Sequence, residues 1–219
     1  EKINTTPIDA TTDFVDTTAP ADTDKSYWIE PLLYKMAQGV SAKVTVKADA
    51  PASPCQRIRL QGDYEAQKIG IGDLDGDGSY DFVIKTPGDT IDPYKVEWKP
   101  SPGTYQLEAY NHEGALLWKK DLGWSIEQGV WYSPYLVYDL DGDGRAEVAV
   151  KTGEGDPRDR KGRVKKGPEY LSILDGLTGV EITRIPWLPR YRDYIFSSRN
   201  QMAIAFLDEK TPSLFMAYR

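Results

Sequence analysis

Sulfur and imidazole groups are nearly absent from this sequence of 219 residues, in which Cys55 is the only cysteine and His112 the only histidine. A single thiol excludes a disulfide within the chain and a cysteine-rich zinc site. No run of about 18 apolar residues occurs, so no membrane span is predicted. Residues 1–4 also lack the pattern of a secretory signal, although a mature secreted chain would begin in the same way.

An excess of basic charge is also lacking: 27 lysines and arginines face 34 acidic residues, for a net charge of −7. This balance gives no reason to expect a nucleic-acid partner. Eight of the acidic residues lie in two short loops, and the other 26 nearly balance the 27 basic ones. The negative charge therefore belongs mainly to those loops, and an anionic partner stays compatible with the rest of the chain.

The two acidic loops are copies of one motif, placed 66 positions apart. Residues 73–81 read Asp-Leu-Asp-Gly-Asp-Gly-Ser-Tyr-Asp, and residues 139–147 read Asp-Leu-Asp-Gly-Asp-Gly-Arg-Ala-Glu. Clustered carboxylates repel one another unless a hard cation neutralises them, and Ca²⁺ takes about six to eight oxygen ligands from such loops. The sequence therefore predicts two calcium sites. Their predicted ligand positions are Asp73, Asp75, Asp77, Ser79, Asp81, Asp139, Asp141, Asp143, Arg145 and Glu147.

The flanking residues distinguish these loops from a helix-loop-helix calcium site. Such a site needs a bidentate glutamate at the twelfth position, where this chain has Ile84 and Val150. The segments before and after each loop are short, apolar and β-branched, which predicts strands. Each loop therefore reads as a β-hairpin turn that wraps a metal. The alternative, a solvated turn without metal, is disfavoured by two copies in the same register.

Two units of about 40 residues follow the same order of strand, acidic turn, strand, long insertion, strand, turn and strand. A third unit starts at residues 201–218 but lacks the acidic ladder, so no metal is expected there. Four-stranded units in series predict the blades of a β-propeller, and two and a half blades cannot close a ring. The prediction is an all-β chain, with part of a β-sandwich at residues 1–50 and the first blades at 51–219. The missing blades are expected from the rest of a longer chain or from another chain.

The second unit resembles one family closely. Residues 137–152, Val-Tyr-Asp-Leu-Asp-Gly-Asp-Gly-Arg-Ala-Glu-Val-Ala-Val-Lys-Thr, and residues 167–179, Gly-Pro-Glu-Tyr-Leu-Ser-Ile-Leu-Asp-Gly-Leu-Thr-Gly, resemble the second calcium blade of bacterial rhamnogalacturonan lyases. Residues 72–85 are similar to the first blade. One departure is Trp131-Tyr132, where the family pattern has a histidine before the tyrosine.

The resemblance implies a fibronectin-like sandwich before an eight-bladed, calcium-stapled propeller in a secreted or periplasmic enzyme. It also implies β-elimination at the galacturonate residues of rhamnogalacturonan, the backbone of pectin, and thus an acidic plant or algal polysaccharide as partner. Three alternatives stay open. One is a propeller lyase acting on another uronate polymer such as ulvan, and another is a non-catalytic, calcium-dependent propeller for carbohydrate binding or adhesion. The third is a hydrolase on the same scaffold.

Propeller geometry places the acidic turns on one face and the long insertions on the other, where loops usually carry function. The two calcium ions are therefore expected to be structural. The insertion at residues 153–168 is basic, which suits a polyuronate, although a solvated charged loop is an equal alternative. The candidates on this face are Tyr132 as proton donor and Trp131, Lys151, Arg158, Arg160 and Arg163 as substrate-binding residues. Lys85 matches Lys151 in the first unit, and this equivalence favours a structural contact with a neighbouring blade.

Overall fold

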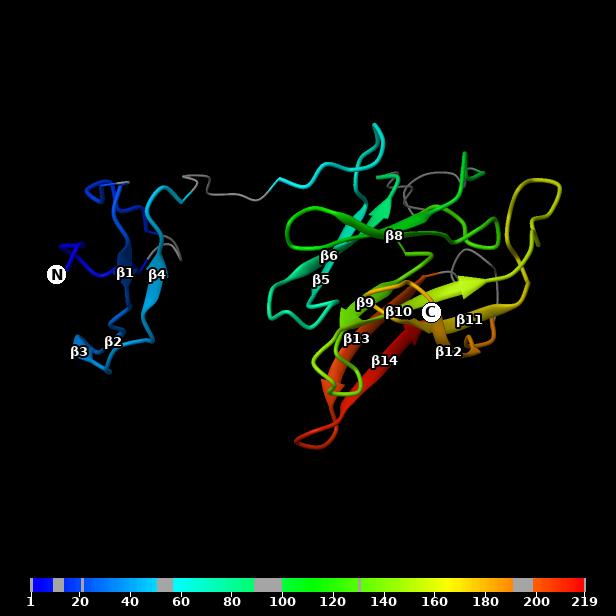
Figure 1. The fold of residues 1–219 in the computed structure, drawn as a ribbon. Coiled ribbons are helices and arrows are strands. Elements are labelled where there is room, and N and C mark those ends of the chain that lie inside the picture. The colour runs from blue at the N-terminus through cyan, green and yellow to red at the C-terminus, as the bar shows by residue number, and fades with distance from the viewer. Residues whose placement is uncertain are drawn as a thin grey trace. The chain divides into compact units, whose positions relative to one another are not determined.

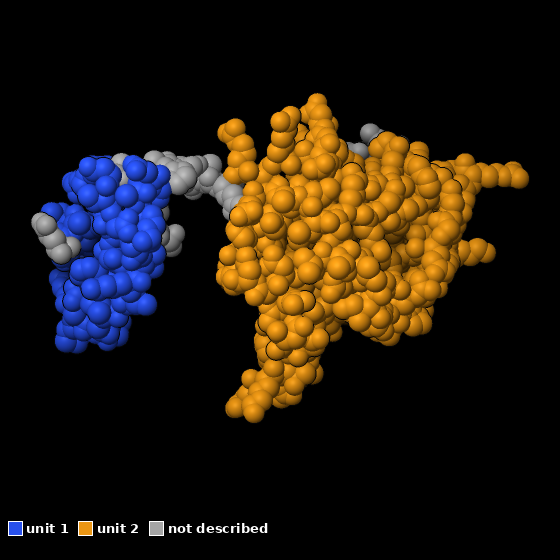
Figure 2. Space-filling view, viewed as in Figure 1, with its two compact units in different colours: residues 1–56 blue, residues 57–219 orange. Residues whose placement is uncertain are grey.

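The computed structural model describes residues 2–9, 14–20, 22–50, 57–88, 100–129, 131–190 and 199–218, which form strands and turns with no helix (Figure 1). None of these described residues therefore belongs to a helix that could cross a membrane. Cys55 and most of the insertion at 87–103 lie outside the described residues. The chain divides into two compact units, residues 1–56 and 57–219 (Figure 2).

The first unit contains two short antiparallel strand pairs among its described residues. Strand β1 (Lys25–Tyr27) pairs with β4 (Val44–Val46), and β2 (Leu32–Leu33) pairs with β3 (Met36–Ala37). The four strands described within residues 1–50 are only two or three residues long. Their side chains are mostly exposed, and sheets this small need another packed layer for stability.

The second unit contains two four-stranded antiparallel sheets in which sequential strands are neighbours. The first sheet consists of β5 (Lys68–Gly72), β6 (Asp81–Thr86), β7 (Gln106–Tyr110) and β8 (Leu116–Asp121). The second consists of β9 (Tyr135–Tyr138), β10 (Glu147–Gly153), β11 (Glu169–Leu174) and β12 (Glu181–Pro186). The predicted fourfold strand repeat is confirmed in both copies.

The two sheets pack against each other through one shared core. Val83 and Leu107 of the first sheet and Tyr135 and Val148 of the second are all at most 1% exposed and belong to one hydrophobic cluster. The central strands β6 and β10 are buried along most of their length, which explains their β-branched runs. The sheets therefore stabilise each other, as serial repeats do.

A third, two-stranded sheet follows. Strand β13 (Asn200–Phe206) pairs with β14 (Pro212–Tyr218), as the third partial unit predicts. Methionine and leucine side chains of this hairpin pack on the second sheet. In its turn, Asp208 Oδ1 accepts the N–H groups of Lys210 (2.9 Å) and Thr211 (2.6 Å), which is an ordinary side-chain-capped turn.

Candidate functional site

Both acidic loops adopt the same hydrogen-bonded form. In the first loop, Asp73 Oδ1 accepts the N–H of Gly76 (2.7 Å) and Oδ2 accepts the N–H of Gly78 (2.8 Å). Asp139 makes the equivalent bonds in the second loop, at 2.7 and 3.0 Å. Gly76 and Gly78 have φ angles of +80° and +86°, a region that glycine enters without steric cost. The repeated Asp-Gly-Asp-Gly sequence thus specifies the turn.

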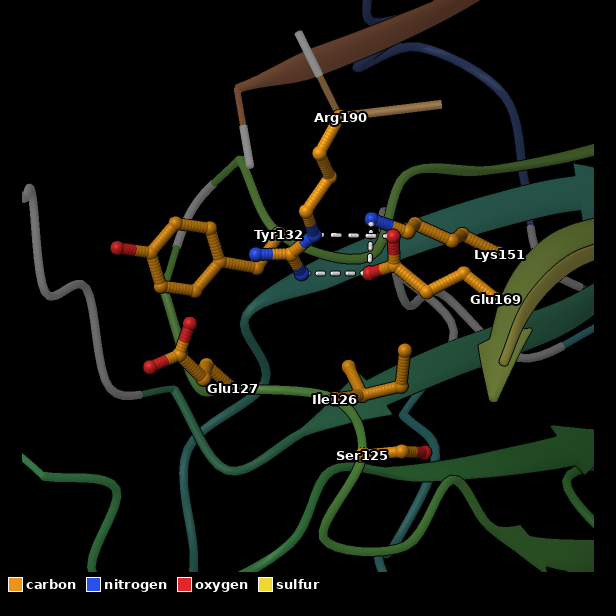
Figure 3. A pocket seen from close by; sticks show the side chains of 7 residues that line it. All are labelled: Ser125, Ile126, Glu127, Tyr132, Lys151, Glu169 and Arg190. Carbon is orange, nitrogen blue, oxygen red and sulfur yellow. Dashed lines mark hydrogen bonds and ion pairs between the residues drawn. The ribbon is translucent and has the colours of Figure 1, made fainter. Parts of the chain in front are cut away.

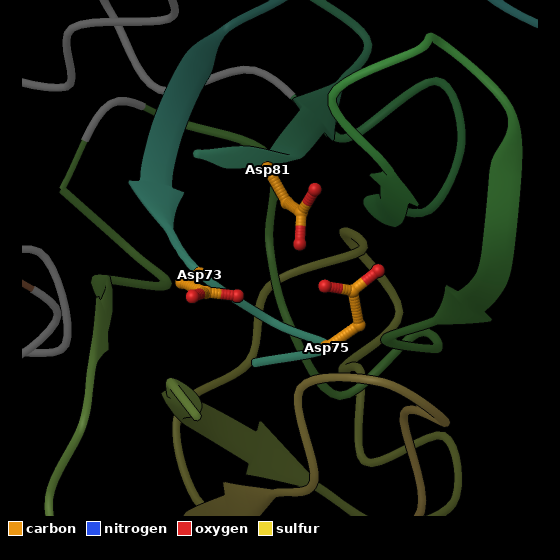
Figure 4. A group of neighbouring side chains, drawn as sticks. All are labelled: Asp73, Asp75 and Asp81. Carbon is orange, nitrogen blue, oxygen red and sulfur yellow. The ribbon is translucent and has the colours of Figure 1, made fainter. Parts of the chain in front are cut away.

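The turn brings three carboxylates together in each loop, with one oxygen of each within 4.8 Å of the others. The first cluster is Asp73, Asp75 and Asp81 (Figure 4), and the second is Asp139, Asp141 and Glu147. Asp77 and Asp143 lie outside these clusters and accept the N–H groups of Ser79 (2.7 Å) and Arg145 (2.8 Å). The structure therefore assembles six of the ten predicted ligand positions directly.

The clusters suit a cation because their innermost carboxylates are buried among like charges. Asp81 is 0% exposed, and burial raises its pKa, with Asp75 and Asp73 adding to the effect against two backbone N–H groups. Burial likewise raises the pKa of Glu147, and the aspartates of its loop add to it. Among the described residues, no lysine or arginine forms an ion pair with the six clustered carboxylates. A hard, oxygen-preferring metal ion would supply the missing positive charge.

The two loops lie side by side at one end of the sheets. The N–H of Ala146 donates to the carbonyl oxygen of Asp73 at 2.6 Å, which joins the second loop to the first. A Cβ built on Gly76 would lie 3.2 Å from Cγ of Arg145. This confirms that the acidic turns share one end, opposite the connections that leave β6, β8, β10 and β12.

A second cluster of polar groups lies at that opposite end, around a small cavity. Its lining residues come from the connection before β9, the end of β10, the start of β11 and the chain after β12: Ser125, Ile126, Glu127, Tyr132, Lys151, Glu169 and Arg190 (Figure 3). The cavity volume of about 10 Å³ is near the lower limit for one water molecule. The cluster is therefore a packed, charged assembly, and a sugar ring would have to bind outside it.

Glu169 lies at the centre of this cluster. Its carboxylate accepts from Lys151 Nζ at 2.9 Å and from Arg190 Nη2 and Nε at 2.6 and 3.1 Å (Figure 3). Burial works to raise the pKa of Glu169, but Arg190 and Lys151 outweigh it and hold that pKa below its usual value. Burial lowers the pKa of Lys151, and repulsion from Arg190 adds to this effect, whereas Glu169 works to raise it.

Two predicted aromatic candidates lie near this cluster. Tyr132 is 3% exposed and lines the cavity together with Glu127. Trp131 is half-buried, and its carbonyl oxygen accepts the N–H of Asn200 at 3.3 Å. The ammonium group of Lys151 lies 5.1 Å from the ring centre of Trp187. The structure thus brings Tyr132 and Lys151 to one cavity, as their predicted shared face requires.

The predicted arginines of the β10–β11 loop differ in their partners. Arg158 forms a two-pronged pair with Asp156, at 2.6 and 2.5 Å. Arg163 Nε lies 3.1 Å from Asp159. Arg160 is exposed at the turn between them. The charges of Arg158 and Arg163 are therefore neutralised by aspartates of the same loop.

Sequence reasoning missed Glu127, Glu169 and Arg190. Glu169 belongs to the Gly-Pro-Glu-Tyr-Leu run that carries the family resemblance, which is the signal that could have identified it. Arg190 reaches Glu169 across 21 positions, a pairing that only the folded sheet creates. The matching lysine, Lys85, donates to the carbonyl oxygen of Ser133 at 2.6 Å, which confirms its predicted contact with the neighbouring sheet.

Comparisons with known proteins agree on one group of relatives. The family described as "Rhamnogalacturonan lyase family 11, C-terminal domain" matches residues 43–219. The chain is 33% identical to the rhamnogalacturonan endolyase YesW and 31% identical to the rhamnogalacturonan exolyase YesX, both of Bacillus subtilis, in each case over 99% of its own length. Among solved structures, the Bacillus licheniformis rhamnogalacturonan lyase PL11 superposes with a TM-score of 0.72 at 29% identity, covering 99% of this chain and 42% of that one.

The fold and the sites define an all-β protein of serial four-stranded sheets, with acidic loops that could hold metal ions at one end and a buried charged cluster at the other. The chain belongs to rhamnogalacturonan lyase family 11. It spans about two fifths of the curated relatives, 39% of YesW and 40% of YesX.

Proposed function

We propose that the complete protein cleaves rhamnogalacturonan by β-elimination at galacturonate residues. A base removes the proton at C5. The electron pair of the broken C5–H bond then forms the C4–C5 double bond while the C4–O bond breaks. A cationic group stabilises the enolate that develops, and an acid protonates the leaving oxygen. The observation that carries this proposal is the 33% identity to a rhamnogalacturonan endolyase over 99% of the chain.

The end that bears the charged cluster is the proposed substrate end. Tyr132 is the proposed proton donor, and Trp131, Lys151 and Arg160 are the proposed substrate-binding residues. The sequence predicts Arg158 and Arg163 in the same role, but each is paired with an aspartate of its own loop. Lys151 is 1% exposed and bound to Glu169, so it would not touch the substrate directly. Its proposed role in binding is to hold Glu169 in place beside the substrate end. The base lies outside these candidates.

The assay for this proposal follows the ultraviolet absorbance of the unsaturated uronate as the full-length protein acts on rhamnogalacturonan. Growth of absorbance on rhamnogalacturonan supports the proposal, and growth on ulvan alone would assign the other uronate polymer. Binding of polysaccharide without absorbance growth would contradict lyase activity. Product size separates internal from terminal cleavage, the two modes named for YesW and YesX.

The metal and the architecture belong to the same proposal. We infer that each acidic loop binds Ca²⁺ and that the sheets are the first blades of an eight-bladed propeller preceded by a fibronectin-like sandwich. Oxygen-only donors favour calcium over softer metals. Apolar side chains are exposed on edge strands of both sheets: Ile69 and Ile71 on β5, and Ile182 and Ile185 on β12. These exposed side chains support further sheets packed on either side. Weak calcium sites also suit the proposed secreted or periplasmic location.

A further inference from the structure

The β10–β11 loop carries six cations, and the structure divides them by their partners. The six are Arg158, Arg160, Lys161, Arg163, Lys165 and Lys166. Three of them form ion pairs with the loop's own aspartates: Arg158 with Asp156 at 2.5 Å, and Arg163 and Lys165 with Asp159 at 3.1 and 3.5 Å. The positive charge seen in the sequence is therefore compensated over much of the loop.

Arg158 has a contact that fixes it still further. Its guanidinium carbon lies 3.7 Å from the ring centre of Trp124, in the connection before β9. The guanidinium thus stacks over an aromatic ring, and its Nε and Nη2 groups both donate to the carboxylate of Asp156. An arginine used in this way joins two loops and has little capacity left for a substrate carboxylate.

Asp159 makes the tip of the loop rigid. Its Oδ1 accepts the N–H groups of Lys161 (2.8 Å) and Arg163 (3.0 Å), and its own N–H donates to the carbonyl oxygen of Arg163 (2.9 Å). Gly162 closes the turn, with its N–H 2.8 Å from the carbonyl oxygen of Asp159 and a φ of +80°. The side chains at this tip therefore project from a backbone of defined shape.

The base of the loop is held by two further contacts. Glu154 pairs with Arg184 of β12 at 2.6 Å, and Arg190 donates to the carbonyl oxygen of Val164. Arg190 is also the guanidinium bound to Glu169, so the loop is tied to the buried cluster. Figure 1 shows the loop extending beyond the ends of β10 and β11.

We propose that Arg160 and Lys161 form a cationic subsite for carboxylates of the anionic polysaccharide, outside the reaction centre. Both are exposed at the rigid tip, and neither forms an ion pair with any residue of the described ranges. A preorganised tip binds at a lower entropic cost than a mobile one. This inference rests on the proposed function for its substrate and adds which of the loop's cations meet it.

The experiment compares the double variant Arg160→Gln/Lys161→Gln with a matched control, Arg57→Gln/Lys210→Gln, in the full-length protein. The control removes the same charge from exposed residues near the acidic-loop end: Arg57 borders the β7–β8 turn, and Lys210 lies in the β13–β14 turn. Steady-state cleavage of rhamnogalacturonan at low and high salt gives kcat and KM, and affinity electrophoresis in the same polymer gives binding without catalysis.

We expect the double variant to raise KM about fivefold at low salt with kcat unchanged, and the difference to shrink below about twofold at several hundred millimolar salt, because exposed charges are screened. Electrophoresis should show the same loss of binding. Equal KM values for the double variant and the control at low salt would overturn the inference, as would an increase that salt does not reduce. An inactive wild-type protein would count against the proposed function alone, because electrophoresis still tests the subsite.

Discussion

At the scale of single residues, the buried carboxylates of the acidic loops are the groups that most destabilise the folded protein when no cation is bound. Asp81 has no exposed surface and lies beside two other aspartates. An uncompensated buried charge destabilises a protein by several kcal/mol, which a bound cation converts into stabilisation. The free energy of unfolding should therefore depend on calcium.

Asp81→Asn tests this dependence. The change keeps the side-chain volume but removes one charge from the first cluster, so the first site should lose its share of the stabilisation. That share is about 2.7 kcal/mol at a calcium concentration of about 100 times Kd. Urea unfolding with calcium and with chelator measures it. The control is Asp208→Asn in the β13–β14 turn, which should leave the calcium effect unchanged. Equal calcium effects on the unfolding free energy of wild type and Asp81→Asn would contradict a metal site at the first loop.

Lys85 is the other residue whose surroundings predict a measurable effect. It is 1% exposed, its ammonium group lies 4.6 Å from the ring centre of Tyr105, and no carboxylate pairs with it among the described residues. Burial lowers its pKa from 10.5 to about 7, with a smaller contribution from Lys68. The charged form is therefore disfavoured in the folded state.

The sign of the pH dependence follows from this shift. Between pH 7 and 10.5 the unfolded chain holds a proton on Lys85 that the folded chain has released, so stability rises with pH in that window. We expect Lys85→Met to remove up to about 1.4 kcal/mol per pH unit from the slope of the unfolding free energy. The exposed Lys210→Met is the control. An unchanged slope in Lys85→Met would show that the ammonium group stays charged throughout.

A functional residue can be predicted from the sequence when its contacts are with residues close to it in the chain. Each acidic loop is a local structure, so spacing alone identifies Asp73 and Asp139 and their turn glycines. The Glu169–Arg190 pair is not local and depends on the register of β11 against β12. No sequence pattern separates Arg158, which pairs with Asp156, from Arg160, which has no ion pair within the described ranges, because the difference lies in the fold of the loop.

At the scale of strands, the contact between the two sheets depends on small residues of β5. A Cβ on Gly70 would lie 2.5 Å from Cγ2 of Val137, and one on Gly72 would lie 2.7 Å from Cγ1 of the same residue. Gly70→Ala should therefore destabilise the protein by about 1–3 kcal/mol through overpacking.

The control for Gly70→Ala is Gly103→Ala. Its added Cβ would meet only the Nε2 of Gln128, at 3.7 Å, so the expected change is within about 0.5 kcal/mol. Chemical denaturation of both variants measures the two values. A Gly70→Ala protein as stable as Gly103→Ala would mean that the sheets do not pack as closely as described.

The strands themselves were predictable from alternating and β-branched runs, but one polar network between elements was not. Glu108 of β7 is 0% exposed and accepts hydrogen bonds from Tyr64, Tyr110 (2.6 Å) and Lys119 (2.7 Å). Tyr64 comes from the segment before β5, which this network attaches to the first sheet. A fully bonded carboxylate of this kind reads in the sequence as one more surface charge.

At the scale of the whole molecule, the two ends of the sheets have different properties. One end carries the paired acidic turns, joined by the Ala146–Asp73 hydrogen bond. The other carries the buried Lys151–Glu169–Arg190 cluster and the projecting basic loop. The sequence predicted this division because strand order dictates which turns share an end. It could not predict the small size of the cavity, which depends on packing.

We propose that the acidic loops support the scaffold and that the reaction takes place at the opposite end. The most direct test is the kcat/KM of full-length Asp81→Asn and Tyr132→Phe on rhamnogalacturonan, measured with saturating calcium at a temperature where both variants are folded. We expect Asp81→Asn to stay within about twofold of wild type and Tyr132→Phe to lose about 100-fold in kcat/KM, as removal of a proton donor does. A folded Asp81→Asn protein that loses activity while Tyr132→Phe keeps it would contradict the account.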